Sequence, residues 1–413
     1  MKATESKTKK TYIPNVIKFF VLYPILFGLL YLLFWPVPIN PVTWESPDAP
    51  ALEGIYQPND FLKSIKVYGG SSAQYDILGR IIIEPGGFSH YAGPEDIVPT
   101  DKIYEIIGGT TVEYLYAGYD NGHIIKYRKN TVFDGTCCYK NSEFFYDTKG
   151  RPLGMALDAN NNLIVADALR GLLAINQEGI GTTLSTKSDS DGIPMKFTDD
   201  LDIAKDGKIY FSDASSVYGI GEDRFDLMEH RPHGRLLMYD PETKLTTTLL
   251  DSLYFANGVA IAPDNSFVLV NETYMYRIHK YWLKGEKAGT SEIIIDNLPG
   301  FPDNISSNGE GLYWVALFTS RNEFIEKTSN KPFLRKMALR LPKFLQPQPE
   351  PFAFVLGIDG NGKVIHNLQY HSENAFSPIT SVKQVGDQLF FGSLTYDGFG
   401  SIAAPKLKTP YHK

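Results

Sequence analysis

A short apolar strand preceded by a tight turn recurs along the chain from about residue 60, and this repeat restricts the possible folds more than any other feature. The strands are EYLYAG, NLIVAD, KIYFSD, FVLVNE, GLYWVAL and QLFFGS, near Leu115, Ile164, Tyr210, Leu269, Trp314 and Phe390. Most successive copies lie about 45–60 residues apart, which is the spacing of propeller blades. A ring of about six blades hides most strand edges. The sequence therefore predicts an all-β, six-bladed β-propeller, with hairpins in a β-sandwich as the alternative.

The composition agrees with a sheet-rich fold and narrows the function. The chain has 25 Tyr and 25 Phe, which favour strands, and 36 Gly and 26 Pro, which suit many turns. The net charge of −7 makes a nucleic-acid-binding surface an unfavourable hypothesis. The two cysteines, Cys137 and Cys138, are adjacent and define no disulfide framework. We expect two buried thiols in a strand there in preference to a strained vicinal disulfide bond.

The amino terminus differs from the rest of the chain. Residues 19–35, FFVLYPILFGLLYLLFW, are an uncharged run just long enough to be a candidate for a membrane span. Four lysines precede the run and indicate a cytoplasmic start, namely Lys2, Lys7, Lys9 and Lys10. No small-x-small cleavage site follows the run, so an uncleaved signal anchor is favoured over a cleaved signal peptide.

These features divide the chain into a cytoplasmic tail, a transmembrane signal anchor, a linker and the propeller, over residues 1–15, 16–36, 37–60 and 61–413. The prediction is a single-pass type II membrane protein that reaches the membrane through its N-terminal helix. The propeller then lies on the extracytoplasmic or lumenal side. Two N-glycosylation sequons, at Asn271 and Asn304, are compatible with that side, although Asn304 is expected to be too enclosed for modification.

An insertion lengthens the last repeat, over residues 318–351. Its segment FLRKMALRLPKFL has an amphipathic and basic pattern, with Lys331, Arg335, Lys336, Arg340 and Lys343 in and around it. A short helix of this kind can lie against a membrane surface or cover a face of the propeller. A solvated insertion is an equal alternative.

Four blades carry a polar residue where the chain leads into the innermost strand, the part of a propeller that faces the central channel. The residues are Glu95 in AGPEDIV, Asp199 in KFTDDLDIA, Asn257 in YFANGVAIAP and Asp303 in PGFPDNISS. An all-oxygen set suits a hard cation such as Ca²⁺, whereas softer metals favour Cys or His. The pattern predicts a calcium site, although Asp and Asn before a strand are usually turn residues. Pro299 and Pro302 are expected to stiffen the last of these loops, so that Asp303 points along the propeller axis.

Longer phrases of the chain resemble the strictosidine-synthase-like family. They include GPEDI, GRPLGMALDANNNLIVADALRGLLAIN, FTDDLDIAKDGKIYFSDASS, RPHGRLLMYDPETK, FANGVAIAPDNSFVLVNET and LPGFPDNI, within about residues 90–320, with a weaker match at SVKQVGDQLFFGSL. The phrases and the N-terminal anchor are similar to the adipocyte plasma-membrane-associated protein type of this family. The resemblance implies a six-bladed propeller and leaves the substrate open.

Two activities occur among propellers of this kind, and the resemblance bears on both. Strictosidine synthase condenses an amine with an aldehyde through a glutamate on the last blade, without a metal. That position aligns with Thr380 in SPITSV, which cannot act as a carboxylate base, while nearby Glu373 is out of register.

The related paraoxonase and gluconolactonase propellers are calcium-dependent esterases and lactonases. Their metal is held by a set of Glu, Asn and Asp in the corresponding loops. Glu95, Asn257 and Asp303 match this set in type, and Asp199 replaces the usual Asn. The resemblance therefore favours the metal-dependent activity over condensation.

The resulting hypothesis is a membrane-anchored, arylesterase-like calcium hydrolase of lipophilic esters or lactones. The cation would polarise the carbonyl, and Asp303 would attack it or activate a water molecule. His90, in FSHYAGPED, is the best candidate proton carrier because it lies near Glu95 in the sequence. The chain has no GxSxG nucleophile elbow and no Walker phosphate loop. The alternatives are a non-enzymatic, membrane-tethered binding platform and a condensing enzyme with a relocated base.

Overall fold

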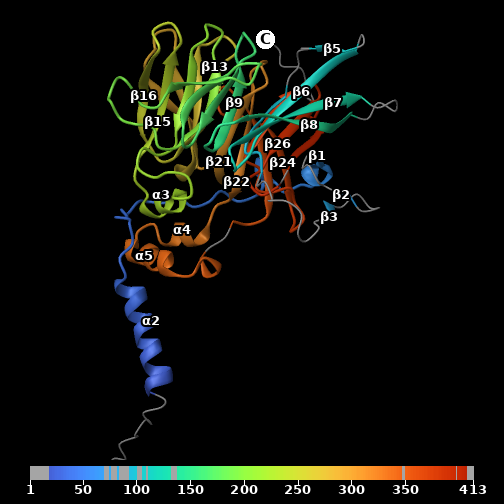
Figure 1. Ribbon diagram of the computed structural model, residues 1–413. Coiled ribbons are helices and arrows are strands. Elements are labelled where there is room, and N and C mark those ends of the chain that lie inside the picture. Colours follow the sequence, from blue (N-terminus) through green and yellow to red (C-terminus); the bar gives the residue numbers. More distant parts are fainter. Residues whose placement is uncertain are drawn as a thin grey trace, which may run out of the picture.

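The computed structural model describes residues 18–68, 74–75, 81–82, 93–99, 105–107, 110–131, 137–346, 349–396 and 398–406. These residues form six larger antiparallel sheets, arranged as the blades of a propeller (Figure 1). The innermost strand of each blade contacts the innermost strand of the next, and the sixth contacts the first. The ring is therefore closed, and the six-bladed β-propeller predicted from the repeat is confirmed.

The first three blades follow the chain. The first contains β4 Ile97–Pro99, β6 Thr110–Gly118, β7 His123–Thr131 and β8 Cys137–Asp147, with β5 Glu105–Ile107 beside β6. The second contains β9 Pro152–Leu157, β10 Leu163–Asp167, β11 Gly171–Ile175 and β12 Gly181–Ser185. The third contains β13 Thr198–Ile203, β14 Ile209–Asp213, β15 Gly234–Asp240 and β16 Leu245–Leu253.

The last three blades complete the ring. The fourth contains β17 Ala256–Ile261, β18 Phe267–Glu272, β19 Arg277–Trp282 and β20 Ser291–Ile295. The fifth contains β21 Gly300–Ser307, β22 Leu312–Ser320, β23 Phe352–Asp359 and β24 Val364–His371. The sixth contains β25 Ser381–Val385, β26 Gln388–Gly392, β27 Phe399–Ala403 and β1 Lys66–Tyr68. Because β1 precedes the first blade in sequence and pairs with β27, it ties the two ends of the propeller together. A small separate sheet pairs β2 Gln74–Tyr75 with β3 Ile81–Ile82.

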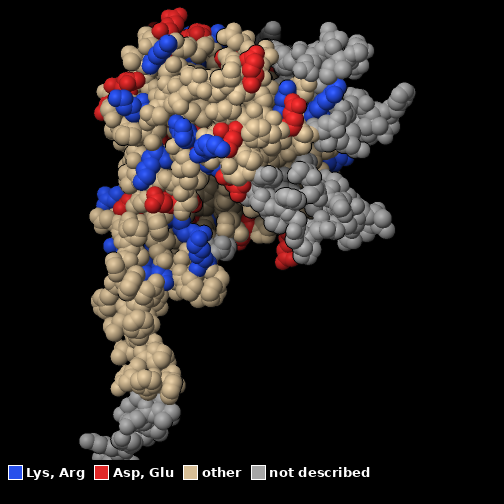
Figure 2. All heavy atoms as spheres, viewed as in Figure 1, with Lys and Arg blue, Asp and Glu red and all other residues tan. Residues whose placement is uncertain are grey.

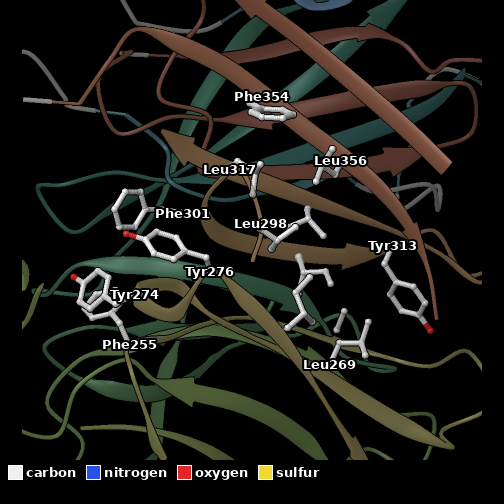
Figure 3. Packing of buried hydrophobic residues seen from close by; sticks show 14 of the residues in the cluster. Phe255, Leu269, Tyr274, Tyr276, Leu298, Phe301, Tyr313, Leu317, Phe354 and Leu356 are labelled. Carbon is white, nitrogen blue, oxygen red and sulfur yellow. The ribbon is translucent and has the colours of Figure 1, made fainter. Parts of the chain in front are cut away.

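The six recurring strands recognised in the sequence are all second strands of blades: β6, β10, β14, β18, β22 and β26. Every residue of β10 and β14 is buried, because each blade packs against a neighbour on both faces. The turns before these strands use residues that tolerate positive φ, at Asn161, Gly207 and Asn265. Between the fourth and fifth blades, Leu269 packs in one cluster with Phe354 (Figure 3).

The apolar N-terminal run begins with the π-helical turn η1 Lys18–Leu22 and continues as α2 Tyr23–Phe34, which projects from the propeller (Figure 1). Within the part of the chain that the structure describes, no helix is long and apolar enough to cross a membrane. The predicted transmembrane helix over 16–36 is therefore not supported by the described residues.

The segment from 37 to 60, predicted as a linker, runs along the protein surface in contact with it. The amide of Val42 donates to the carbonyl of Glu229 (3.1 Å), and the amide of Trp44 donates to the carbonyl of Ser329 (3.3 Å). Two short 3₁₀ helices follow, η2 Gly54–Tyr56 and η3 Phe61–Ser64. Tyr56 is buried in the cluster that also holds Leu269.

Four helical segments cover the propeller face nearest α2. α3 Asp223–Glu229 joins β14 to β15, and the insertion supplies α4 Glu323–Lys327, α5 Pro332–Arg340 and η5 Lys343–Leu345 (Figure 1). The insertion thus covers a propeller face. Two of its basic residues, Arg335 and Arg340, are buried. They are buried because their side chains bind backbone carbonyl groups of neighbouring segments.

Candidate functional site

A cavity of about 350 Å³ opens on the helix-covered face, at the end of the central channel. It brings together residues from at least four blades that are far apart in sequence. All four predicted ligands line it: Glu95, Asp199, Asn257 and Asp303. The structure therefore places the predicted set at one point, as expected for residues in the same position of successive blades.

Three of these residues lie inside innermost strands, at shifts in the strand pairing. The sequence had predicted them in the loops that precede those strands. The pairing register shifts in β13 between Thr198 and Leu201, in β17 between Ala256 and Val259, and in β21 between Pro302 and Ile305. A β-bulge turns side chains that would otherwise follow the pleat. The bulges thus direct Asp199, Asn257 and Asp303 towards the cavity. Glu95 differs, because it lies just before β4.

Acidic residues at the ends of second strands hold the segments that lead into these innermost strands. Asp213 accepts hydrogen bonds from the amides of Lys196 (3.1 Å) and Phe197 (2.9 Å). Glu272 accepts one from the amide of Tyr254 (2.9 Å). In the second blade, Asp167 accepts one from the amide of Arg151 (3.0 Å). The final acid of NLIVAD, KIYFSD and FVLVNE is the repeated sequence pattern that could have revealed this role.

The backbone around Asp303 is held by side chains of β18 and of the 3₁₀ turn Thr273–Met275 that follows it. The side-chain amide of Asn271 donates to the carbonyl of Asp303, and the hydroxyl of Thr273 donates to the carbonyl of Pro302 (2.7 Å). A side chain at Gly258 would come within 2.6 Å of the backbone of Asn304, so only glycine fits there. Asn304 is buried, as expected, and Asn271, the other residue in a glycosylation sequon, is buried as well.

Several carboxyl groups are buried close together at the site. Glu95, Asp199 and Asp303 are buried, and Arg151 approaches Glu95 with 3.8 Å between Nη2 and Oε2. Burial raises the pKa of Glu95 to about 7, although Arg151 opposes the shift. Burial and repulsion from Glu95 and Asp303 raise the pKa of Asp199 well above its usual value. Burial and repulsion from Glu95 likewise raise the pKa of Asp303, against a hydrogen bond from Asn257.

The donor set fits a hard cation. One buried side-chain oxygen each of Asp199, Asn257 and Asp303 has no hydrogen-bond partner, which is unusual for a buried polar atom. These atoms are carboxylate and amide oxygens, the ligands that calcium prefers. Among the described residues, no group of three or more His, Cys, Asp or Glu side chains is already arranged to hold a metal ion. A metal site in this cavity would therefore use the amide oxygen of Asn257 in addition to carboxylate oxygens.

An aromatic wall borders the same cavity and was missed at the sequence level. Phe255 stacks on Tyr274 with ring centroids 4.6 Å apart and meets Phe197 edge-on at 5.3 Å. Phe301 lies edge-on to Tyr274 at 6.5 Å (Figure 3). In three blades a phenylalanine stands two residues before the candidate ligand, in FTD, FAN and FPD. This Phe-x-Asp/Asn repeat could have indicated an apolar pocket beside the polar residues.

No histidine of the described residues is part of the cavity lining. His90 lies outside the described residues, as do the side chains of Cys137 and Cys138. His230 and His233 belong to the segment around the end of α3 and are absent from the described cavity lining. His123 lies 3.9 Å from Asp147 in the first blade.

Comparisons with known proteins show the family to which the chain belongs. The strictosidine synthase family model matches residues 199–286. Adipocyte plasma membrane-associated protein of Rattus norvegicus is 31% identical over 373 residues, covering 86% of this chain and 90% of that protein. The chain belongs to the strictosidine-synthase-like family. Strictosidine synthase-like 6 of Arabidopsis thaliana is 40% identical over 253 residues, which cover 61% of this chain and 66% of that relative.

Solved structures also resemble this chain, at lower sequence identity. A gluconolactonase from Xanthomonas campestris covers 76% of this chain and 98% of its own length, at 16% identity and a TM-score of 0.49. A calcium-binding protein, regucalcin, from Agrobacterium tumefaciens covers 78% of this chain and 97% of its own, at 12% identity and a TM-score of 0.46.

Thr380, which aligns with the glutamate of strictosidine synthase, has a structural role in this chain. Thr380 is buried, and its hydroxyl donates to the backbone carbonyl of Glu95. Glu373, the other carboxylate considered there, is exposed and absent from the described cavity lining. Neither residue places a carboxylate base in the cavity.

Proposed function

We propose that this strictosidine-synthase-like propeller is a calcium-dependent hydrolase of lipophilic esters or lactones, tethered to a membrane by its N-terminal apolar helix. One observation carries the proposal. Buried oxygens of Asp199, Asn257 and Asp303 lack hydrogen-bond partners and belong to residues that line the same apolar-walled cavity.

The charge balance of the cavity supports a bound divalent cation. Four carboxyl groups line the cavity, on Glu95, Asp199, Asp223 and Asp303, against two arginines, Arg151 and Arg224, so that acidic groups are in excess. Buried carboxylates that repel one another must either take up protons or gain a counter-charge. A divalent cation supplies two positive charges and lets these groups ionise together around it.

The chain's own residues can then perform the parts of an ester hydrolysis. Bound calcium would contribute polarisation of the substrate carbonyl. Asp303, which is buried and has one unpaired oxygen, would accept a proton from a water molecule that attacks the carbonyl carbon, or would attack that carbon itself. Phe197, Phe255 and Phe301 would bind the apolar part of the substrate and exclude bulk water. The condensation reaction is not favoured, because Thr380 offers no carboxylate.

The tether is supported by the surface of α2. This helix has twelve residues and none of them is buried, although apart from one glycine and one proline it consists of aliphatic and aromatic residues. Arg340 fixes its end to the body, since Nε donates to the carbonyl of Trp35 (2.6 Å) and Nη1 to that of Leu32 (2.8 Å). An apolar helix held out from the protein in this way is suited to insertion into lipid, with the propeller on the lumenal or extracytoplasmic side.

The test uses the full chain in detergent micelles, with phenyl esters and aliphatic lactones as substrates. Wild type, Asp303→Asn and the exposed control Asp251→Asn are assayed with calcium and with a calcium chelator. We expect calcium-dependent turnover that Asp303→Asn loses and Asp251→Asn keeps. Absence of turnover on every ester and lactone, with chelation still lowering the melting temperature, would refute the hydrolase and leave a metal-braced binding platform.

A further inference from the structure

We infer that α5 and η5 carry a second membrane contact, which seats the mouth of the cavity on the lipid surface. We call this the interfacial face. It consists of four large apolar side chains with exposed fractions of 50%, 40%, 81% and 57%, on Phe333, Leu334, Phe344 and Leu345. The inference rests on the membrane tether proposed above. It adds the route by which a lipophilic substrate reaches the cavity.

The first turn of α5 reverses the orientation expected for a helix on a water-soluble protein, although Ala338 further along is buried. Such a helix turns its apolar stripe inward and its charged residues outward. In α5 the arginines Arg335 and Arg340 are buried, whereas Phe333 and Leu334 are exposed. The inversion indicates that something other than water covers the outer side of α5.

The buried arginines show that this orientation is built into the fold. The guanidinium group of Arg335 donates to the carbonyl of Met228 (2.7 Å) and to that of Val42. It also lies over the ring of Trp44, 4.5 Å from the centroid. Rotating α5 to bury its phenylalanine would break these contacts and leave the carbonyl groups unpaired. The apolar residues are therefore held on the outside.

The chemistry around the interfacial face matches an anionic lipid surface. The run KPFLRKMALRLPKFLQ, residues 331–346, contains no Asp or Glu. Lys331 and Lys343 are exposed beside the apolar residues. Figure 2 shows Lys and Arg side chains where the body of the protein meets the uncharged α2. Aromatic and aliphatic residues flanked by lysines are typical of segments that lie in the headgroup region of a bilayer.

The interfacial face, α2 and the cavity mouth lie on the same side of the propeller. Arg340 of α5 binds the end of α2, which fixes the two helices together. The same insertion lines the cavity, through Ile325 of α4 and through Gln346, which directly follows η5. A bilayer that receives α2 and the interfacial face therefore lies next to the mouth. A substrate dissolved in lipid can reach the aromatic wall without crossing bulk water.

The first experiment measures contact with lipid and does not depend on catalysis. The full chain carrying Phe344→Trp is reconstituted in vesicles of phosphatidylcholine with phosphatidylserine, in which the acyl chains are either brominated or unmodified. Bromine quenches tryptophan fluorescence on contact. The matched control is Leu245→Trp, which is 52% exposed at the β15–β16 turn, on the face away from α2.

We expect the brominated lipid to quench Phe344→Trp several-fold more than Leu245→Trp, after subtraction of the wild-type signal from the four native tryptophans. Equal quenching of the two variants, at wild-type melting temperatures, would overturn the interfacial face. Concentration-dependent dimers with an unquenched Phe344→Trp would overturn it too, because the face would then pair two copies of the chain.

A second experiment tests the substrate route. The double variant Phe344→Glu, Leu345→Glu keeps α2 but places charge on the interfacial face. We expect turnover of a long-chain ester dissolved in the vesicles to fall several-fold, while turnover of a water-soluble phenyl ester stays at the wild-type rate. An equal effect on both esters would contradict the route through lipid. If the protein hydrolyses neither ester, the hydrolase proposal fails while the quenching result still decides the interfacial face.

Discussion

The hydroxyl of Thr380 donates a hydrogen bond of 2.7 Å to the backbone carbonyl of Glu95. The carbonyl of Thr380 in turn accepts one from the amide of Asn304 (3.0 Å). One buried residue of the last blade thus connects the segments that carry Glu95 and Asp303, which are far apart in sequence. The position that resembles the catalytic glutamate of the synthase serves here to hold two candidate ligands in place.

Replacing Thr380 with valine tests this connection. Valine has nearly the same shape but leaves the buried carbonyl of Glu95 without its donor. We therefore expect the free energy of unfolding to fall by about 1–3 kcal/mol. Denaturant unfolding of the full chain in detergent measures the change. Thr243→Val, at an exposed turn, is the control and should leave stability unchanged. Equal stability of the two variants would show that the bond contributes nothing.

Asn271 offers a test of ligand positioning without touching a candidate ligand. Its amide binds the backbone of Asp303, so Asn271→Ala should loosen the segment and weaken calcium binding by about ten- to a hundredfold, as is usual for outer-shell partners. Calcium titration followed by the melting temperature provides the measurement. The exposed Asn160→Ala should bind like wild type. If Asn271→Ala binds calcium as tightly as wild type, the position of Asp303 does not determine calcium binding.

The repeat favoured the propeller over a β-sandwich, because each blade is specified by local patterns. Turn residues with positive φ precede a strand that is apolar on both faces, and β10 and β14 show the pattern clearly. The convergence of Asp199, Asn257 and Asp303 was also predictable, since equal positions in successive blades meet at the axis. Their location within β-bulges was not predictable, because a bulge depends on pairing with the partner strand.

The contacts of the insertion could not be read from the sequence. The pattern of α5 predicts an amphipathic basic helix, but nothing in it indicates that Arg335 turns inward. That orientation depends on the carbonyl groups of Val42 and Met228, which are brought in from distant segments. The aromatic wall is a different case, because the phenylalanines two residues before the candidate ligands were visible in the sequence.

His230 should make the protein sensitive to acid. It is buried, stacks on Trp44 with ring centroids 3.6 Å apart, and neither ring nitrogen has a hydrogen-bond partner. Burial, together with the nearby Arg335 and against the opposing charge of Glu272, lowers the pKa of His230 from 6.5 to about 3. The unfolded chain therefore binds a proton between about pH 6.5 and 3 that the folded chain does not. Stability from this group is present above pH 6.5 and is lost as the pH falls through that range.

We therefore expect His230→Phe to gain stability relative to wild type as the pH falls below 6.5, by at most about 1.4 kcal/mol per pH unit. The comparison cancels the buried carboxyl groups, which titrate in both proteins. Denaturant unfolding at a series of pH values measures the difference. A stability difference that does not change with pH would mean that His230 takes up its proton at the same pH in the folded and the unfolded chain.

Arg340 should determine how firmly α2 is attached to the body. Its guanidinium group satisfies the carbonyls of Leu32 and Trp35 at the end of α2, where a helix leaves carbonyl groups without partners and favours positive charge. Arg340→Gln removes the charge and at least one donor. We expect the free energy that holds α2 against the body to fall by about 1–3 kcal/mol. Proteolysis between α2 and the propeller should become several-fold faster, with little change in the unfolding of the blades. Lys336→Gln, on the same helix, is the control. Equal cleavage rates in the two variants would show that the packed segment after α2, and not Arg340, holds the helix in place.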